Sequence, residues 1–166
     1  MSQTPDNDAM IEVLLSSIVT RHTSQQQLIK LKEKGGDRCF PIVIGLPEAA
    51  EIRRVVKQQD TERPMTHELL IKAIEGLGSK LVRVDITDLS NHTFFARLVL
   101  SAAEGEDPVY VDARPSDAIA LALRAGAPLR VAESVLAEVR TDESADPLED
   151  EDEGEAGAEG DPSSPE

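Results

Sequence analysis

The sequence predicts an α+β fold: a mostly antiparallel or mixed β-sheet packed with about three helices in a single compact domain. Two pairs of apolar segments, within residues 28–45 and 80–102, are separated by turn residues rather than by a helix, which favours antiparallel pairing. Residues 47–59, 66–77 and 115–124 instead have the composition or spacing of helices. The 166 residues suffice for one hydrophobic core with short appendages.

The negative charge is concentrated at the C-terminal end. The formal net charge is −15, but residues 141–166 hold 12 of the 32 acidic residues and none of the 17 Lys and Arg, so that residues 1–140 carry only −3. The block Glu149–Glu153 cannot bury enough apolar surface to offset its ordering entropy. We therefore predict a disordered N-terminus over residues 1–9, a folded domain over residues 10–140 and an acidic disordered tail over residues 141–166.

Cysteine content and hydropathy predict a cytoplasmic protein that does not bind membranes. The single cysteine, Cys39, excludes an intrachain disulfide and a cysteine-cluster metal site, and we expect it to be buried at a strand start. Residues 1–8 lack a basic segment and no apolar run approaches the length of about 20 residues that crosses a bilayer. Aromatic residues make up 2% of the chain, too few for several base-stacking platforms.

The first half of the chain predicts three strands. Residues 10–20 are rich in β-branched side chains. Residues 28–32 and 39–45 flank the turn Gly35-Gly36-Asp37 as a hairpin, in which Pro41 forces an edge position or a bulge.

Four further strands are expected in the second half. Residues 80–86 and 93–102 form a hairpin whose connection, residues 88–92, is too long for a tight turn. Short strands follow at residues 109–111 and 129–131, the latter before a short helix over residues 133–139.

Two helices precede the second hairpin. The helix over residues 47–59 begins at a proline and is expected to turn Ala50, Val55 and Val56 toward the core and its basic residues toward water. The helix over residues 66–77 has apolar residues at the spacing of a core face, namely Leu69, Leu70, Ala73, Ile74 and Leu77.

A strand, a polar corner and a buried helix follow one another at residues 109–124. The run over residues 118–123 is too apolar for a helix with one wet face. The corner before it contains four polar side chains: Asp112, Arg114, Ser116 and Asp117. Unpaired backbone N–H groups and the positive end of the helix dipole collect at such a place, so the corner can hold an anion or position catalytic groups.

The same corner has a purely structural interpretation. Pro115 suits the first helical turn, and Ser116 or Asp117 can cap the helix. Arg114 can pair with Asp112.

A second corner, Arg63-Pro64-Met65-Thr66-His67-Glu68, repeats the arrangement of Arg-Pro followed by a hydroxyl residue and an acid. The repetition suggests a pair of helix N-termini that each present an arginine. His67, kept neutral by the positive helix end, can act as a base or ligate a metal. The alternative has Thr66 as N-cap, with His67 and Glu68 solvated.

Carboxylates at strand ends raise the hypothesis of a metal site. Asp85 and Asp88, with Asp112 and Asp117, could form an oxygen-ligand cluster for Mg²⁺ or Mn²⁺. Turn formation is the alternative role of such aspartates. The sequence contains no glycine-rich phosphate loop, paired-cysteine zinc motif, serine nucleophile elbow or Rossmann fingerprint, which excludes most familiar enzyme classes.

Three motifs, in this order and with these gaps, together resemble the bifunctional nuclease family. They are Arg63-Pro64-Met65-Thr66-His67-Glu68-Leu69-Leu70, Phe94-Phe95-Ala96-Arg97-Leu98, and the stretch from Asp112 to Arg124 that contains Arg-Pro-Ser-Asp-Ala-Ile-Ala-Leu-Ala. The resemblance covers roughly Val13 to Val139. It implies a compact α+β domain that forms homo-oligomers, with RNase and DNase activity in some members.

If that activity holds, the resemblance assigns residues to phosphodiester hydrolysis assisted by Mg²⁺ or Mn²⁺. Arg63 and Arg114 would bind phosphate, His67 would be the base or a metal ligand, and Ser116 would donate at the helix start. Asp112 and Asp117 would ligate the metal or orient the arginines. Glu48 and Asp88 are weaker candidates, Asp88 as a metal ligand.

Charge favours two competing classes. The folded part lacks a basic run and the acidic tail would repel a polyanion, whereas nucleic-acid binding depends on Lys and Arg. The chain could instead be a non-catalytic, homo-oligomeric interaction or regulatory protein whose tail binds a basic partner. It could also bind a small anion at its two helix N-termini. Convergence of His67, Arg63, Arg114 and Asp117 in an open cleft would favour the nuclease, and burial of Arg114 against Asp112 and Asp117 would favour the structural interpretation.

Overall fold

The computed structural model describes residues 8–19, 26–104, 106–139 and 141–142. Its strands are β1 (Met10–Val19), β2 (Gln26–Glu33), β3 (Arg38–Gly45), β4 (Leu81–Ser90), β5 (Thr93–Leu100), β6 (Val109–Ala113), β7 (Leu129–Ala132) and β8 (Thr141–Asp142). Its helices are α1 (Leu46–Val56), α2 (Thr66–Gly76), α3 (Pro115–Ala125) and α4 (Glu133–Val139). The α+β class is confirmed, and α4 has the bounds of the short helix expected over residues 133–139.

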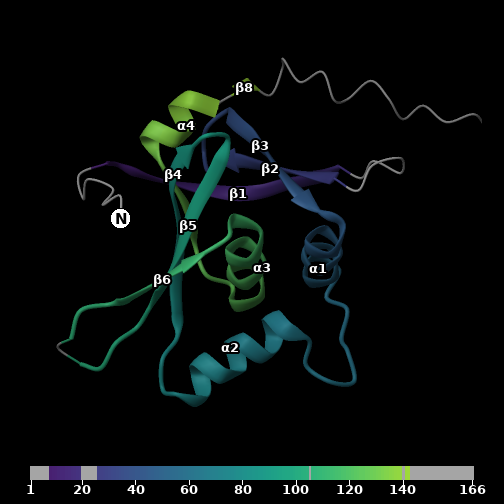
Figure 1. Cartoon of the computed structure of the whole chain (residues 1–166), viewed down its shortest axis with the longest axis vertical. Helices are drawn as coiled ribbons and strands as arrows, with labels where there is room; N and C mark the ends of the chain where they lie inside the picture. The colour runs from purple at the N-terminus through teal and green to yellow at the C-terminus, as the bar shows by residue number, and fades with distance from the viewer. Residues whose placement is uncertain (1–7, 20–25, 105, 140, 143–166) are drawn as a thin grey trace, which may run out of the picture.

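One mixed sheet of eight strands runs through the described residues in the order β6-β5-β4-β7-β1-β2-β3-β8. The meanders β1-β2-β3 and β4-β5-β6 are both antiparallel, and β7 joins them by pairing antiparallel with β1 and parallel with β4. The two meanders cross at a steep angle in Figure 1, as the accumulated right-handed twist of a long sheet requires.

The core lies between the sheet and α3. Ile119 and Leu121 are almost fully buried, and they belong to one apolar cluster with Val84 and Ile86 of β4. Burial of such a side chain contributes about 1.5–3 kcal/mol. The prediction of a buried helix is therefore confirmed, and Gly126, with a φ of 64°, ends it in the left-handed conformation that glycine adopts readily.

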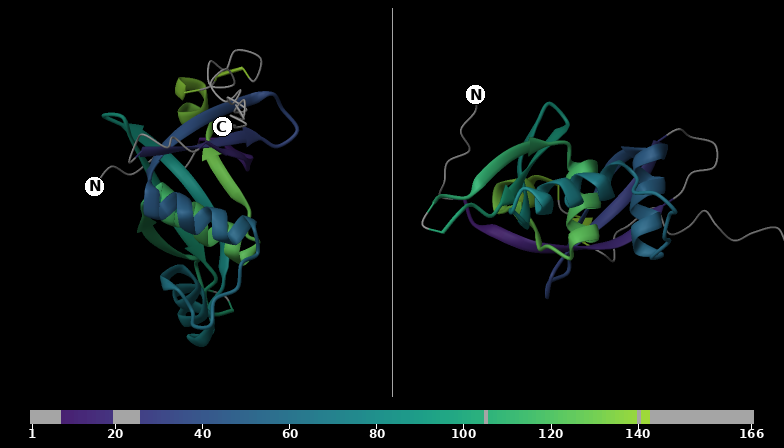
Figure 2. Two further views of the ribbon diagram at one scale, coloured as in Figure 1. Left: turned by 90° about the vertical axis from the view of Figure 1, so that its right-hand side faces the viewer. Right: turned by 90° about the horizontal axis from the view of Figure 1, so that it is seen from below.

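The predicted core face of α1 is wrong. Ala49, Glu51 and Ile52 are buried, whereas Ala50 and Val56 are exposed, and the helix ends at Val56 rather than near residue 59. The positions of Ala49 and Ile52, one turn apart, define the side that packs on α3. The two further views in Figure 2 keep α1 beside α3.

The predicted core face of α2 is confirmed at Ile74 and wrong at the other four positions. Only Ile74 of this helix is buried, and Leu77 just after it is 87% exposed. Leu69 and Leu70 are exposed as well. Helical spacing predicts an apolar stripe but not what covers it, and α2 lies below α3 in Figure 1 rather than over the sheet.

The connection between β4 and β5 is tighter than expected. β4 continues to Ser90, so that Asn91 and His92 alone turn the chain, with φ of 49° and 59°. Both central residues of a two-residue hairpin of this type need a positive φ, which asparagine tolerates well. The predicted long loop over residues 88–92 is therefore wrong.

The predicted termini fall mostly outside the described residues, which begin at residue 8 and end at residue 142. Thr141–Asp142, assigned above to the tail, form β8 and pair with Arg38 and Cys39 of β3. Cys39 is buried, as expected. In the described part of the chain no helix has both the length and the apolar character needed to span a bilayer.

Candidate functional site

The N-termini of α2 and α3, where the two similar corners lie, meet in the structure. His67, in the first turn of α2, lies with its Nε2 3.1 Å from Oδ1 of Asp117, in the first turn of α3. The positive end of the α3 dipole favours the carboxylate at this position. Residues 50 positions apart are thereby joined at one point.

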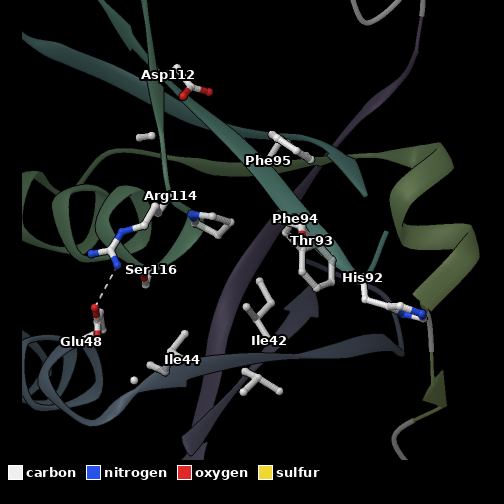
Figure 3. A pocket seen from close by; sticks show the side chains of 14 residues that line it. Ile42, Ile44, Glu48, His92, Thr93, Phe94, Phe95, Asp112, Arg114 and Ser116 are labelled. Carbon is white, nitrogen blue, oxygen red and sulfur yellow. Dashed lines mark ion pairs between the residues drawn. The ribbon is translucent and has the colours of Figure 1, made fainter. Parts of the chain in front are cut away.

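Arg114 is held by two carboxylates at the entrance to α3. Its Nε and Nη2 donate to Asp117 Oδ2 and Oδ1 at 2.8 and 3.2 Å, and its Nη1 lies 3.2 Å from Oε1 of Glu48 on α1. Figure 3 shows the side chain extended toward Glu48. The Arg114 side chain is nevertheless 67% exposed, so the guanidinium is fixed in place and open to solvent.

These contacts determine the ionisation states of Asp117 and Arg114. Burial would raise the pKa of the Asp117 carboxyl, but the hydrogen bonds from Arg114 and His67 outweigh it and hold that pKa below its usual value. The hydrogen bond to Asp117 raises the pKa of Arg114 in turn. Asp117 is therefore an anion and Arg114 a cation throughout the neutral range.

The capping interpretation of both corners is wrong. The N-cap residues are Arg114 for α3 and Met65 for α2, and neither helix has a side-chain cap hydrogen bond. Thr66 and Ser116 lie inside the helices instead. Because Pro115 occupies the first turn of α3, the preceding Arg114 takes the extended N-cap conformation that aims its side chain outward.

Arg114 and Ser116 stand at one end of a cleft of about 400 Å³. Ile42, Ile44 and Phe94 form an apolar wall, and Figure 3 shows His92 at the other end. The lining combines apolar side chains with polar groups at both ends, Arg114 and Ser116 at one and His92 at the other. His67 and Asp117 are not among the residues that line it.

Behind His67 lies a buried carboxylate that the sequence does not single out. Glu51 of α1 is only 6% exposed, and its Oε1 lies 4.0 Å from His67 Nδ1 and 2.6 Å from Arg124 Nη2. Arg54 binds the other carboxylate oxygen. Both ring nitrogens of His67 thus face carboxylates, Asp117 on one side and Glu51 on the other.

Burial of a glutamate depends on ion pairs, and one partner of Glu51, Arg124, comes from a distant segment, so no local pattern marks Glu51 as buried. Arg124 is the last residue of the Asp112–Arg124 motif, and the sequence predicts no functional role for it. Its guanidinium joins Glu51 and, at 3.7 Å, Glu68 of α2. These contacts tie α1, α2 and α3 together through side chains.

The remaining candidates form no hydrogen bond or ion pair with Arg114 or His67 among the described residues, although Asp112 lines the cleft. Arg63 is exposed, and its side chain makes no hydrogen bond or ion pair with any described residue. Asp88 lies in β4 opposite Phe95, and Asp112 lies in β6 opposite Arg97. Figure 3 shows Asp112 turned away from Arg114.

The carboxylate cluster predicted as a metal site is not assembled. Asp85 is fully buried among Arg83, Arg97 and Arg130, and Asp117 is bound to Arg114 and His67. Within the described ranges no group of three or more His, Cys, Asp or Glu side chains could hold a metal ion. The residues present in one chain therefore do not fit Mg²⁺ or Mn²⁺ in the predicted way.

Comparison with known proteins agrees with the family resemblance found in the sequence. A family model described as the bifunctional nuclease domain matches residues 29–144. An uncharacterized protein of Mycobacterium tuberculosis is 42% identical over 131 residues, which is 78% of this chain and 76% of the mycobacterial protein. Bifunctional nuclease 1 of Oryza sativa is 26% identical over 113 residues, which is 67% of this chain but only 34% of the rice protein. A bifunctional nuclease of Oryza minuta matches to the same extent.

Proposed function

Because the chain belongs to the bifunctional nuclease family, we propose that it hydrolyses phosphodiester bonds of RNA, DNA or both at the Arg114 end of the cleft. The carrying observation is a fixed, exposed guanidinium beside an apolar wall. The guanidinium has five N–H donors, and the contacts to Asp117 and Glu48 engage three of them. The other two can bind a phosphate and offset the charge that develops during hydrolysis.

Asp117, Glu48 and His67 act as positioning residues in this proposal. Asp117 and Glu48 hold the guanidinium from two sides, and His67 holds Asp117. Ser116 lines the cleft in the first turn of α3, where free backbone N–H groups favour an anion. Proton transfer by His67, proposed from the family resemblance, requires one ring nitrogen to leave its carboxylate.

Dependence on Mg²⁺ or Mn²⁺ remains a prediction. Since the three predicted ligands Asp88, Asp112 and Asp117 do not form one site, no step is derived through a metal. The same assay that tests hydrolysis tests this dependence, with each ion and with EDTA.

The test is cleavage of labelled single-stranded RNA and duplex DNA by the full-length protein and by three variants. Arg114→Ala is expected to lower the rate about 100-fold, the typical loss when one donor to transition-state charge is removed. Asp117→Asn is expected to lower it less, because the arginine remains but is less well oriented. His67→Ala is expected to have the smallest effect, roughly tenfold, because it acts through Asp117.

A matched control is Asp60→Asn, an exposed aspartate outside the helices with no ion pair in the described residues. Its rate should equal that of the wild type. A loss of about 1,000-fold in His67→Ala would instead assign proton transfer to His67. No cleavage by pure wild-type protein, or equal cleavage by Arg114→Ala, would overturn the proposal.

One observation favours the interaction protein as second candidate. α2 exposes Leu69 and Leu70 on a helix with a single buried residue, and Leu77 follows them. Such a surface is typical of contacts between protein chains. Homo-oligomer formation, a basic partner for the acidic segment and a cytoplasmic location therefore stay predictions, and light scattering of the full chain tests the first.

A further inference from the structure

We propose that Arg83, Arg97 and Arg130, with the exposed Phe95 and Tyr110, form a second surface that binds the backbone and bases of a single-stranded nucleic acid. The surface lies beside the Arg114 cleft and shares Phe95 with it. The choice of ligand rests on the proposed function. The surface would hold the part of the nucleic acid that lies next to the bond that is cut.

The three arginines converge on Asp85 from three adjacent strands. Nε of Arg83 and of Arg130 lies 3.2 and 3.1 Å from Asp85 Oδ1, and Nε of Arg97 lies 3.4 Å from Oδ2. Val84 and Ile86 point into the core toward α3, so Asp85 between them points to the other face of the sheet. The cluster is thus separate from the contacts between the helices.

The cluster carries more positive charge than its own stability requires. Asp85 is 0% exposed, and one arginine would neutralise it, yet three surround it. In the described part of the chain no second carboxylate lies within ion-pair distance of these arginines. Each donates to Asp85 through Nε alone, which leaves its two Nη groups for a ligand.

A row of opposed residues leads from the cluster to the cleft. Five residues are paired in register across five strands: Glu12, Arg130, Asp85, Arg97 and Asp112. Asp112, at the end of this row, also lines the cleft. A strand bound along Arg130 and Arg97 therefore reaches the cleft without crossing the core of the protein.

Aromatic side chains lie beside the arginines. Tyr110 of β6 is 52% exposed, and its ring centre lies 4.6 Å from Arg97 Cζ. Phe95 precedes Arg97 by two residues on the same face of β5, is exposed, and lines the cleft as well. Exposed rings next to arginines on a sheet can stack unpaired bases while the guanidinium groups bind phosphates.

Three features were hidden in the sequence. The arginines are isolated along the chain, so no basic run marks them. The aromatic residues are few, but two of them lie on one face. The near-neutral charge of residues 1–140 conceals an uneven distribution in space.

The test is fluorescence anisotropy with the full-length protein in EDTA and a labelled poly(U) strand of about 12 nucleotides, within the site sizes of known single-strand binders. The double variant Arg83→Gln, Arg130→Gln is expected to bind about tenfold more weakly. The slope of log affinity against log salt should fall by about 1.4, since each phosphate contact to a single strand contributes about 0.7. Tyr110→Leu should weaken binding about tenfold and leave this slope unchanged.

Lys57→Gln is the matched control, because Lys57 is an exposed cation at the end of α1. It should bind within about twofold of the wild type. Circular dichroism verifies each fold, and if the double variant unfolds, the two single variants replace it, since each leaves two arginines on Asp85.

Each outcome decides one question. Wild-type affinity in the arginine variants, or no binding by the wild type at low salt, would overturn the inference. Cleavage by the wild type with unchanged binding in the arginine variants would overturn the inference alone. Arginine-dependent binding without any cleavage would support the inference and overturn the proposed hydrolysis.

Discussion

Two carboxylates, Glu51 between the helices and Asp85 on the sheet, lie buried under arginines, and their surroundings differ in one respect. Two arginines bind Glu51, and one of them is shared with another acid, because Arg124 also approaches Glu68. Those that bind Asp85 have no second acidic partner among the described residues. The arginine Arg124 of the first group is therefore engaged by acids of the protein itself, and the arginines of the second group have N–H groups left for a ligand.

The backbone explains why the two groups differ in what they contribute to the fold. Between their ends helices make their backbone hydrogen bonds internally, so α1, α2 and α3 contact one another through side chains such as Glu51. The strands around Asp85 are already joined by their ladders. The arginines on the sheet are thus not needed to hold neighbouring elements together, which leaves them available for binding.

The largest expected effect is on the free energy of unfolding, when one arginine is removed from the Glu51 group and the result is compared with removal of one from the Asp85 group. Arg124→Gln should lower the free energy of unfolding by about 3 kcal/mol, because it breaks a buried pair and leaves Glu51 and Glu68 less compensated. Arg83→Gln should lower it by less than about 1 kcal/mol, because two arginines remain on Asp85. Urea denaturation measures both, and equal losses would remove the distinction between the two groups.

A smaller effect is expected from Asp117→Asn, and it depends on pH. The pKa of Asp117 is lowered in the folded state, so its contribution is complete above the ordinary value of 3.8 and is lost as the pH falls through the lowered pKa. Wild type and variant should differ by about 1.5 kcal/mol at neutral pH, a typical value for hydrogen bonds to a charged group. Denaturation at several pH values measures the difference, and Asp60→Asn should show none.

The smallest effect separates two roles for Asp112. As an exposed carboxylate opposite Arg97, it repels a phosphate bound there, so Asp112→Asn should tighten oligonucleotide binding about twofold. As a metal ligand, the role predicted from sequence, it would be needed for cleavage. Anisotropy and cleavage assays on the same variant distinguish the two roles by the sign of the change.

The local sequence pattern was sufficient to predict burial where the composition of one segment decides it. The apolar run over residues 118–123 has no polar face to offer to water, so α3 had to be buried whatever its neighbours. The repeated Arg-Pro corners marked two helix starts, and both helices begin there, but their contact through His67 and Asp117 was not predictable from the repetition.

Local pattern was insufficient where burial is decided by a distant segment. The stripe on α2 is apolar, yet other helices occupy the sheet, so Leu69 stays exposed. Glu51 is paired in its buried position with Arg54 of the same helix and with Arg124, which arrives from 73 residues further along the chain. Arg83 and Arg130 come together because β7 inserts beside β4, a parallel pairing that no short motif encodes.

That insertion of β7 has a consequence for the order of folding. Each three-stranded meander can form from its own sequence, but β4 and β1 have no partner on their facing edges until Leu129–Ala132 has been made and placed. Contacts between distant parts of a chain form slowly, and unpaired inner strands invite wrong pairings in the meantime. During synthesis the two meanders therefore cannot be joined until β7, Leu129–Ala132, has been made. A change that slows the insertion of β7 should increase misfolding without altering the stability of the folded protein to the same degree.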